Sequence, residues 1–110
     1  MSGWWVVVDS RSPAERDASE DKLSFLLASW EAGPYDMRFL DDLVNSGKAK
    51  KLKFNGYPNR YLTLLEDLVP FIIDGPPCNH GFVSKVEVKR EKIKSLPLNH
   101  QVTIDVWDNT

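Results

Sequence analysis

One short segment of the chain carries residue types suited to nucleophilic catalysis: Cys78-Asn79-His80, directly after a Gly-Pro-Pro turn at 75–77. A thiol nucleophile needs a base within hydrogen-bond reach and usually a third group that orients the base. Cys78 and His80 are two residues apart in a loop, so they can approach each other, but nothing in the sequence forces them to. We therefore interpret them as a loop cysteine and a surface histidine, and a cysteine hydrolase is kept as an alternative.

Motifs that would bind a metal, a phosphate or an acyl intermediate are missing from the sequence. His100 is the only other histidine, and zinc needs three or four ligands. There is no glycine-rich phosphate loop, no Gly-x-Ser-x-Gly and no His-Glu-x-x-His. Adjacent carboxylates such as Asp41-Asp42 diverge around a helix and suit capping or solvation. We predict no catalytic residue, no metal, no cofactor and a protein that is not an enzyme.

Acidic residues concentrate in the first part of the chain. Residues 1–47 carry nine Asp/Glu against four Lys/Arg, whereas residues 48–110 carry seven against ten, for a net charge of −2. If residues 12–31 form a helix, Phe25 lies nearly opposite the apolar stripe, and four carboxylates share one flank of that stripe. An exposed aromatic beside acidic residues is typical of a protein-binding surface, although a loop or a second helix covering Phe25 would leave the same pattern. The candidate protein-binding residues are Asp17, Glu20, Asp21, Phe25 and Glu31.

A second candidate surface is basic and aromatic and surrounds an Asn-Gly hairpin signal at 55–56. Lysines beside stackable aromatic rings suit single-stranded nucleic acid, but lysines on an edge strand also protect a sheet from aggregation. A nucleic-acid-binding module is therefore the alternative to a protein-binding one. Its residues are Lys50, Lys51, Lys53, Tyr57, Arg60 and Tyr61.

Four tryptophans are a large number for this length. Trp30 and one of Trp4 and Trp5 are expected in the core, because neighbouring residues of a strand point to opposite faces. The other of that pair and Trp107 would then lie on a sheet face without helices. Such an aromatic face predicts a binding surface or a homodimer interface.

The elements that must position these residues follow from hydropathy patterns. Ser12 and Glu15 form a capping box, with Pro13 at the first helical position, and begin a helix that is predicted to run to about Glu31. Its stripe facing the core is Leu23, Leu26, Leu27 and Trp30. Further helices are predicted after Asp36, ending near Gly47, and from Asp67, with a helical turn at 90–95. Strands are predicted at 4–8, 50–54, from 60 or 61, at 82–88 and at 101–108, the last with Val102, Ile104 and Val106 on one face. This order indicates an α+β domain, with a mainly antiparallel sheet of four to five strands and two to three helices packed on one face.

Length and composition set the broad class. A chain of 110 residues predicts one domain, 1–110, and 42% hydrophobic with 27% charged residues predicts that it folds. No apolar run approaches the roughly 20 residues of a membrane helix, and no signal peptide is evident. A single cysteine fits a reducing compartment. We therefore expect a cytoplasmic protein without membrane contact.

Several short motifs together resemble small uncharacterised proteins encoded among phage and prophage genes. They are Met1–Val8, Pro13–Asp17, Ala28–Glu31, Gly56–Tyr61, Asp74–Pro77 and Val102–Asp108. The resemblance covers most of the chain and carries no catalytic residue with it. It implies a bacterial cytoplasm and a role in phage–host conflict, where anti-CRISPR and immunity proteins inhibit by covering a surface.

The sequence thus predicts a non-catalytic binding protein: a phage-associated stoichiometric inhibitor of a bacterial nuclease or nucleoprotein complex. Its acidic residues would meet a basic surface that normally binds nucleic acid. The nucleic-acid-binding module and a small phage structural or assembly protein stay open as alternatives.

Overall fold

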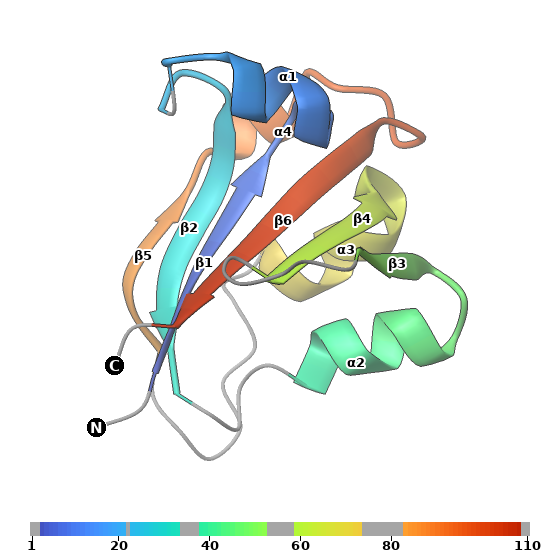
Figure 1. Ribbon diagram of the computed structural model, residues 1–110. Coiled ribbons are helices and arrows are strands. Elements are labelled where there is room, and N and C mark those ends of the chain that lie inside the picture. Colours follow the sequence, from blue (N-terminus) through green and yellow to red (C-terminus); the bar gives the residue numbers. More distant parts are fainter. Residues whose placement is uncertain (1–2, 22, 34–37, 53–58, 74–82, 109–110) are drawn as a thin grey trace.

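The computed structural model describes residues 3–21, 23–33, 38–52, 59–73 and 83–108. Within these ranges six strands form one antiparallel sheet in the order β3-β4-β6-β1-β2-β5 (Figure 1). The strands are β1 (Trp4–Asp9), β2 (Leu26–Ala32), β3 (Ala49–Leu52), β4 (Asn59–Leu64), β5 (Val83–Val88) and β6 (Gln101–Asp108). The helices are α1 (Pro13–Ala18), α2 (Arg38–Asn45), α3 (Leu65–Ile72) and α4 (Arg90–Lys94).

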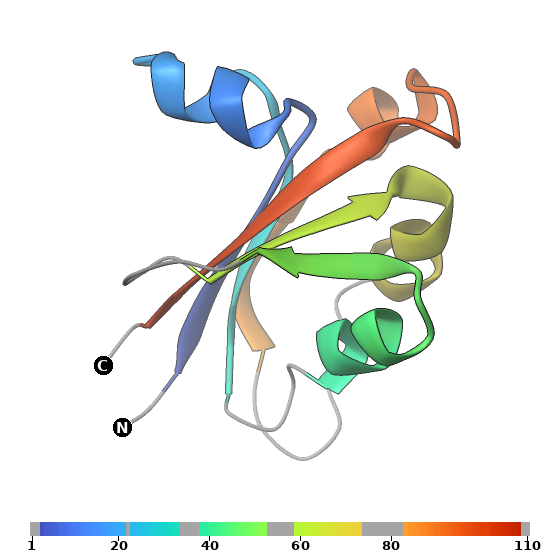
Figure 2. The ribbon, with the colours of Figure 1, turned by 45° about the vertical axis from the view of Figure 1, so that its right-hand side comes forward.

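The apolar core lies between one face of the sheet and the helices α2, α3 and α4, while α1 lies on the opposite side of the sheet (Figure 2). The alternation predicted for β6 is confirmed, because Val102, Ile104 and Val106 all point into the core. Trp30 from β2 is fully buried there, and its ring centroid lies 6.1 Å from that of Phe39 on α2. These contacts confirm the α+β class and the placing of three helices on one face.

The predicted helix over residues 12–31 is wrong beyond its first turns. Its capping box is present, with Ser12 and Glu15 bonded to each other, but α1 ends at Ala18. The Asp21 carboxylate then accepts backbone hydrogen bonds from Leu23 and Ser24, at 3.1 and 2.9 Å, and turns the chain. The apolar run that follows becomes β2, which pairs on both sides and supplies a sixth strand. Buried runs of this length suit a helix or a two-sided strand equally, and long-range pairing decides between them.

The remaining elements follow their predicted positions closely. β1 is central, between β6 and β2, and β3 pairs with β4 as an antiparallel hairpin, although its turn lies outside the described residues. α3 begins two residues before the predicted cap Asp67, because its first amides donate to the carbonyls of His100 and Leu98, each at 2.8 Å. Pro70 consequently lies inside the helix instead of in its first turn.

Helix α2 ends in a left-handed glycine. Gly47 has φ 79°, its amide donates to the Val44 carbonyl at 3.1 Å, and the Lys48 amide donates to the Leu43 carbonyl at 2.8 Å. This pair of bonds is a Schellman cap, which satisfies carbonyls that the helix itself cannot. It leads the chain directly into β3.

We expect Gly47→Ala to lower the free energy of unfolding by about 1 kcal/mol, because a Cβ makes the left-handed conformation costly. Nothing lies within 4 Å of the added Cβ, so the effect is conformational and not steric. Urea unfolding measures it, with Asn45→Ala, at the exposed last residue of α2, as the control. An unchanged midpoint for Gly47→Ala would contradict the assignment.

Candidate protein-binding surface

The sheet face that carries α1 holds a group of buried charges, called here the charge cluster. It consists of Asp9, Arg11, Arg16, Arg60 and Asp105. Asp9 ends β1, and Asp105 lies opposite Val7 in the β1–β6 register, so the two carboxylates share one face as diagonal neighbours. Their exposed fractions are 0% and 1%, which makes pairing with cations obligatory.

Three arginines satisfy the two carboxylates. Asp9 accepts from Arg11 Nε at 3.0 Å, from Arg11 Nη2 at 2.8 Å and from Arg16 Nη1 at 2.8 Å. Asp105 accepts from Arg16 Nε at 2.7 Å, and from Arg60 Nε and Nη2 at 2.6 and 3.0 Å. Arg16 therefore bridges aspartates on two adjacent strands.

The pKa of Asp9 reflects these contacts. Burial acts to raise the pKa of this carboxyl, but hydrogen bonds from the Arg11 side chain and backbone and from Arg16 outweigh it, and the pKa lies below its ordinary value of 3.8. Asp9 is therefore ionised in the folded protein at neutral pH, where it pairs with the arginines.

Arg60 connects the cluster to α1 from β4. Its Nε and Nη2 donate to Asp105, and its Nη1 and Nη2 donate to Asp17 of α1 at 2.8 and 2.9 Å. The hydrogen bonds that Arg60 donates to Asp17, and then those to Asp105, raise the pKa of the guanidinium further above its ordinary value. The Arg60 side chain is buried, whereas that of Asp17 is 61% exposed. The pair therefore reaches from the interior to the surface.

The charge cluster determines where α1 lies. This helix has six residues, and Arg16 is its buried residue. A helix this short is marginal without tertiary contacts. Because Arg16 and Asp17 reach strands β1, β6 and β4, ion pairs take the place that an apolar stripe holds in α2 and α3.

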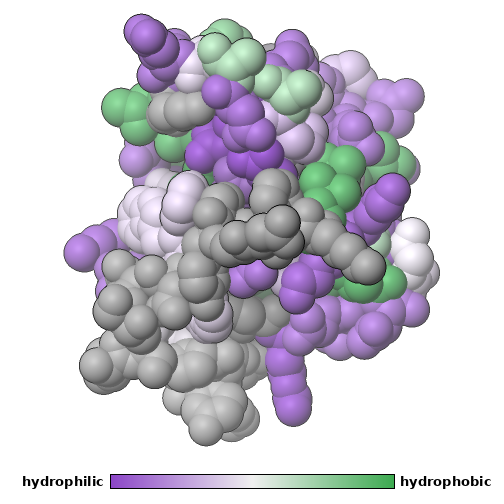
Figure 3. All heavy atoms as spheres, viewed as in Figure 1, coloured by the Kyte–Doolittle hydropathy of each residue, from purple (hydrophilic) through white to green (hydrophobic). Residues whose placement is uncertain are grey.

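The segment after α1 presents acidic and apolar side chains to solvent. We call Asp17, Glu20, Asp21, Leu23 and Phe25 the α1–β2 surface, and all five are exposed. The exposed fractions of Leu23 and Phe25 are 73% and 45%. In Figure 3 hydrophobic atoms lie beside the α1–β2 connection at the upper left, next to hydrophilic ones. Phe25, predicted as either covered or exposed, is exposed.

The α1–β2 surface is held to the charge cluster through Phe25. The guanidinium carbon of Arg11 lies 4.4 Å from the centroid of the Phe25 ring, a cation–π contact. The Ser10 amide also donates to the Phe25 carbonyl at 3.0 Å. Arg11 therefore bonds a buried carboxylate on one side and supports an exposed aromatic ring on the other.

The structure brings four of the five predicted protein-binding residues together. The fifth, Glu31, lies near the other end of β2, opposite Trp5 in register, and its carboxylate is 3.3 Å from the Lys85 ammonium. Helical spacing placed Glu31 with the others, and the strand moves it away. Leu23 is the residue that the sequence analysis missed, because a helical stripe assigned it to the core. Only the turn that Asp21 makes exposes it.

The second candidate surface, the basic and aromatic patch around residues 50–61, is not one surface among the residues that the structure describes. Lys50 and Lys51 are exposed and belong to opposite faces of β3, Arg60 is in the charge cluster, and Tyr61 is buried in the core. The Lys51 ammonium lies 5.7 Å from the Tyr61 ring centroid. The patch residues Lys53 and Tyr57, and also Cys78 and His80, lie outside the described residues.

The tryptophans are distributed as predicted for a two-faced sheet. Trp30 is buried and Trp4 packs against the core. Trp5 and Trp107 are cross-strand partners in the β1–β6 register on the face opposite the core, and Trp107 is 40% exposed. The expectation that this face carries no helix is wrong, because Arg16 of α1 bonds Asp9 and Asp105 there. A binding or dimer role for this pair stays a prediction.

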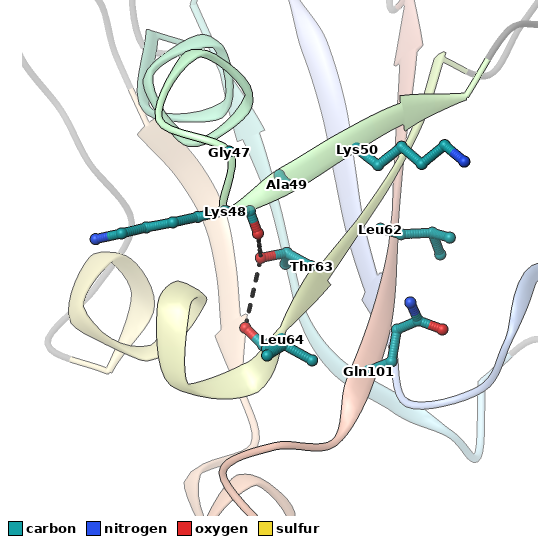
Figure 4. A pocket seen from close by; sticks show the side chains of 8 residues that line it. All are labelled: Gly47, Lys48, Ala49, Lys50, Leu62, Thr63, Leu64 and Gln101. Carbon is teal, nitrogen blue, oxygen red and sulfur yellow. Dashed lines mark hydrogen bonds between the residues drawn. The ribbon is translucent and has the colours of Figure 1, made fainter.

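A hollow of about 190 Å³ lies where β3, β4 and β6 meet. Lys50 and Leu62 extend to one side of it and Lys48 to the other (Figure 4). The Thr63 hydroxyl donates to the Lys48 carbonyl at 2.9 Å. Its lining holds no histidine, cysteine or carboxylate. In the part of the chain that the structure describes, no group of three His, Cys, Asp or Glu side chains could hold a metal ion, and no helix is long and apolar enough to cross a membrane.

Comparison with known proteins adds no relative. The chain matches no protein-family model, no curated protein and no solved structure. The geometry of the α1–β2 surface and of the charge cluster beneath it is therefore what indicates the function of the protein.

We expect Asp9→Asn to lower the free energy of unfolding at neutral pH by about 3–5 kcal/mol, because it leaves buried arginines without their carboxylate. A pKa that is lower in the folded state gives stability that is complete above about pH 5 and is lost as the pH falls below 3.8. Asp9→Asn should therefore lose less stability than the wild type on acidification. Urea unfolding over this pH range tests both expectations.

Asp42→Asn, on an exposed position of α2, is the matched control, and it should change the free energy of unfolding by less than about 0.5 kcal/mol. Equal losses of stability on acidification in the wild type and in Asp9→Asn would show that Asp9 does not supply this dependence.

Proposed function

We propose that the protein is a non-catalytic binding protein and that the α1–β2 surface contacts its partner. One observation supports this most directly: Leu23 and Phe25 are exposed large apolar side chains on a segment that also exposes three carboxylates. Exposed apolar groups with polar neighbours are typical of protein-binding sites, and aromatic side chains are frequent hot spots in interfaces.

The rigidity of the segment also favours binding. Phe25 is held by the Arg11 guanidinium and by the Ser10 amide, and the Asp21 carboxylate fixes the preceding turn. Hydrogen bonds from Ser24 and then from Leu23 lower the pKa of Asp21, so these bonds favour its charged form. A partner therefore meets a preorganised surface, and less conformational entropy is lost on association.

The partner that fits this surface is a protein with a basic face. Carboxylates on an exposed segment attract lysine and arginine side chains and steer association. Nucleases and nucleoprotein complexes present such basic faces, since they bind phosphates through Lys and Arg. Our proposal is that the protein inhibits a bacterial nuclease or nucleoprotein complex stoichiometrically, in the bacterial cytoplasm and in a phage or prophage setting, by covering that face.

Direct nucleic-acid binding is less favoured by the described residues. Arg60 is engaged by two aspartates and Tyr61 is in the core, so neither is available to a nucleic-acid strand. Lys50 and Lys51 belong to opposite faces of β3, so they do not line one groove that could follow a phosphate backbone.

The test is affinity capture from a nuclease-treated bacterial lysate with the tagged wild type, Glu20→Lys and Phe25→Ala, read by quantitative mass spectrometry. We expect the wild type to retain one stoichiometric protein. Glu20→Lys should weaken its capture and flatten the salt dependence, because a rim charge is reversed. Phe25→Ala should reduce affinity at least about tenfold, because it removes the aromatic anchor.

Asp42→Lys is the matched control: it reverses an exposed charge on α2, away from the α1–β2 surface, and should bind as the wild type does. If both surface variants capture the same protein as strongly as the control, the α1–β2 surface is not the contact. Recovery of nucleic acid alone, from lysate without nuclease treatment, would favour the nucleic-acid-binding alternative.

A further inference from the structure

A second hollow, of about 150 Å³, opens directly beside the α1–β2 surface. Phe25 and Leu27 of the β2 region and Leu96, which follows α4, form its apolar walls. Ser24, Lys92 and Ser95 line its mouth. The hollow therefore joins the exposed anchor Phe25 to the edge of the core.

The walls of this hollow are fixed in place by contacts on every side. Arg11 lies against one face of the Phe25 ring, so the ring cannot swing into the cavity without losing the cation–π contact. Leu27 is 2% exposed and Leu96 packs against the core. The Lys92 ammonium donates to the Ser24 carbonyl at 2.6 Å and ties α4 to the α1–β2 connection.

We infer that this hollow is a docking pocket for one aliphatic side chain of the protein partner, about the size of leucine. The inference deepens the proposed function and depends on it. The hollow of about 150 Å³ is open to solvent, and its volume leaves room for one leucine side chain, since an enclosed apolar cavity of similar volume takes benzene in a well-studied engineered case. Because the pocket is already open, filling it costs little reorganisation.

Charge at the mouth of the pocket indicates what flanks that leucine. The Asp21 carboxylate accepts from the Ser24 amide at 2.9 Å, so it lies at the mouth, and exposed Glu20 precedes it. Lys92, the cation of the lining, keeps its positive charge and donates to the Ser24 carbonyl, so the two carboxylates of Glu20 and Asp21 outnumber it at this edge. The partner segment that fits therefore carries arginine or lysine next to the leucine, which agrees with a basic face.

The test uses three blocked pentapeptides whose central residues are Arg-Leu-Arg, Arg-Ala-Arg and Asp-Leu-Asp, titrated into the full chain and followed by NMR. We expect Arg-Leu-Arg to shift the methyl signals of Leu27 and Leu96 and the amides of Glu20 and Asp21. Arg-Ala-Arg should shift the amides alone and bind about tenfold more weakly, because it buries less apolar surface. Asp-Leu-Asp should leave all four residues unshifted.

A filled-pocket variant makes the test independent of the peptides' intrinsic affinity. Ser95→Leu places an apolar side chain at the mouth, and it should reduce the affinity for Arg-Leu-Arg to that for Arg-Ala-Arg. Asn99→Leu, an exposed residue outside the pocket lining, is its control and should not change the affinity. Equal binding of Arg-Leu-Arg by the wild type and Ser95→Leu overturns the inference.

The outcomes also separate the inference from the proposed function. Amide shifts of Glu20 and Asp21 with both arginine peptides, without methyl shifts of Leu27 or Leu96, would overturn the pocket and leave the basic-partner proposal standing. No shift with either arginine peptide would contradict both.

Discussion

The docking of α1 on the sheet depends on the bridge that Arg16 makes between Asp9 and Asp105. Two carboxylates buried on adjacent central strands lack solvation by water and need cationic partners. The guanidinium of Arg16 bonds both, at 2.8 and 2.7 Å, and Arg11 and Arg60 satisfy the remaining oxygens. Because Arg16 belongs to α1, the contacts that pair it with the two buried carboxylates also dock this helix on the sheet.

The two faces of the sheet are therefore covered by different kinds of contact. On one face, α2, α3 and α4 cover valine and isoleucine side chains by close apolar packing, which tolerates small changes of angle. On the other face, fork-shaped guanidinium groups must meet carboxylates in specific directions, so few orientations of α1 allow these ion pairs. Buried ion pairs need not add net stability. Here they orient the short helix and, through Arg11, the Phe25 ring.

This orientation links the interior to the surface that we propose binds a partner. Arg60 ties β4 to exposed Asp17, and Arg11 ties β1 to exposed Phe25, so both ends of the α1–β2 surface are anchored in one cluster. The Asp21 turn and the Lys92–Ser24 bond fix the segment between and the pocket beside it. A surface supported in this way loses little entropy when it binds, which suits inhibition by surface coverage.

The sequence by itself determined the elements whose signals are local. The capping box of Ser12 and Glu15, the stop at Gly47 and the alternation of Val102, Ile104 and Val106 each depend on neighbouring residues, and the α+β class followed from them. The acidic residues and Phe25 were also proposed as a surface, but through a helix that ends at Ala18 instead of running to Glu31. Only the tertiary structure decided that residues 26–32 pair as β2, that Leu23 faces solvent and that Arg60 is buried. The pairing of β2 and the burial of Arg60 depend on partners far away in sequence, such as Asp105, 45 positions from Arg60, and no local pattern encodes such a contact.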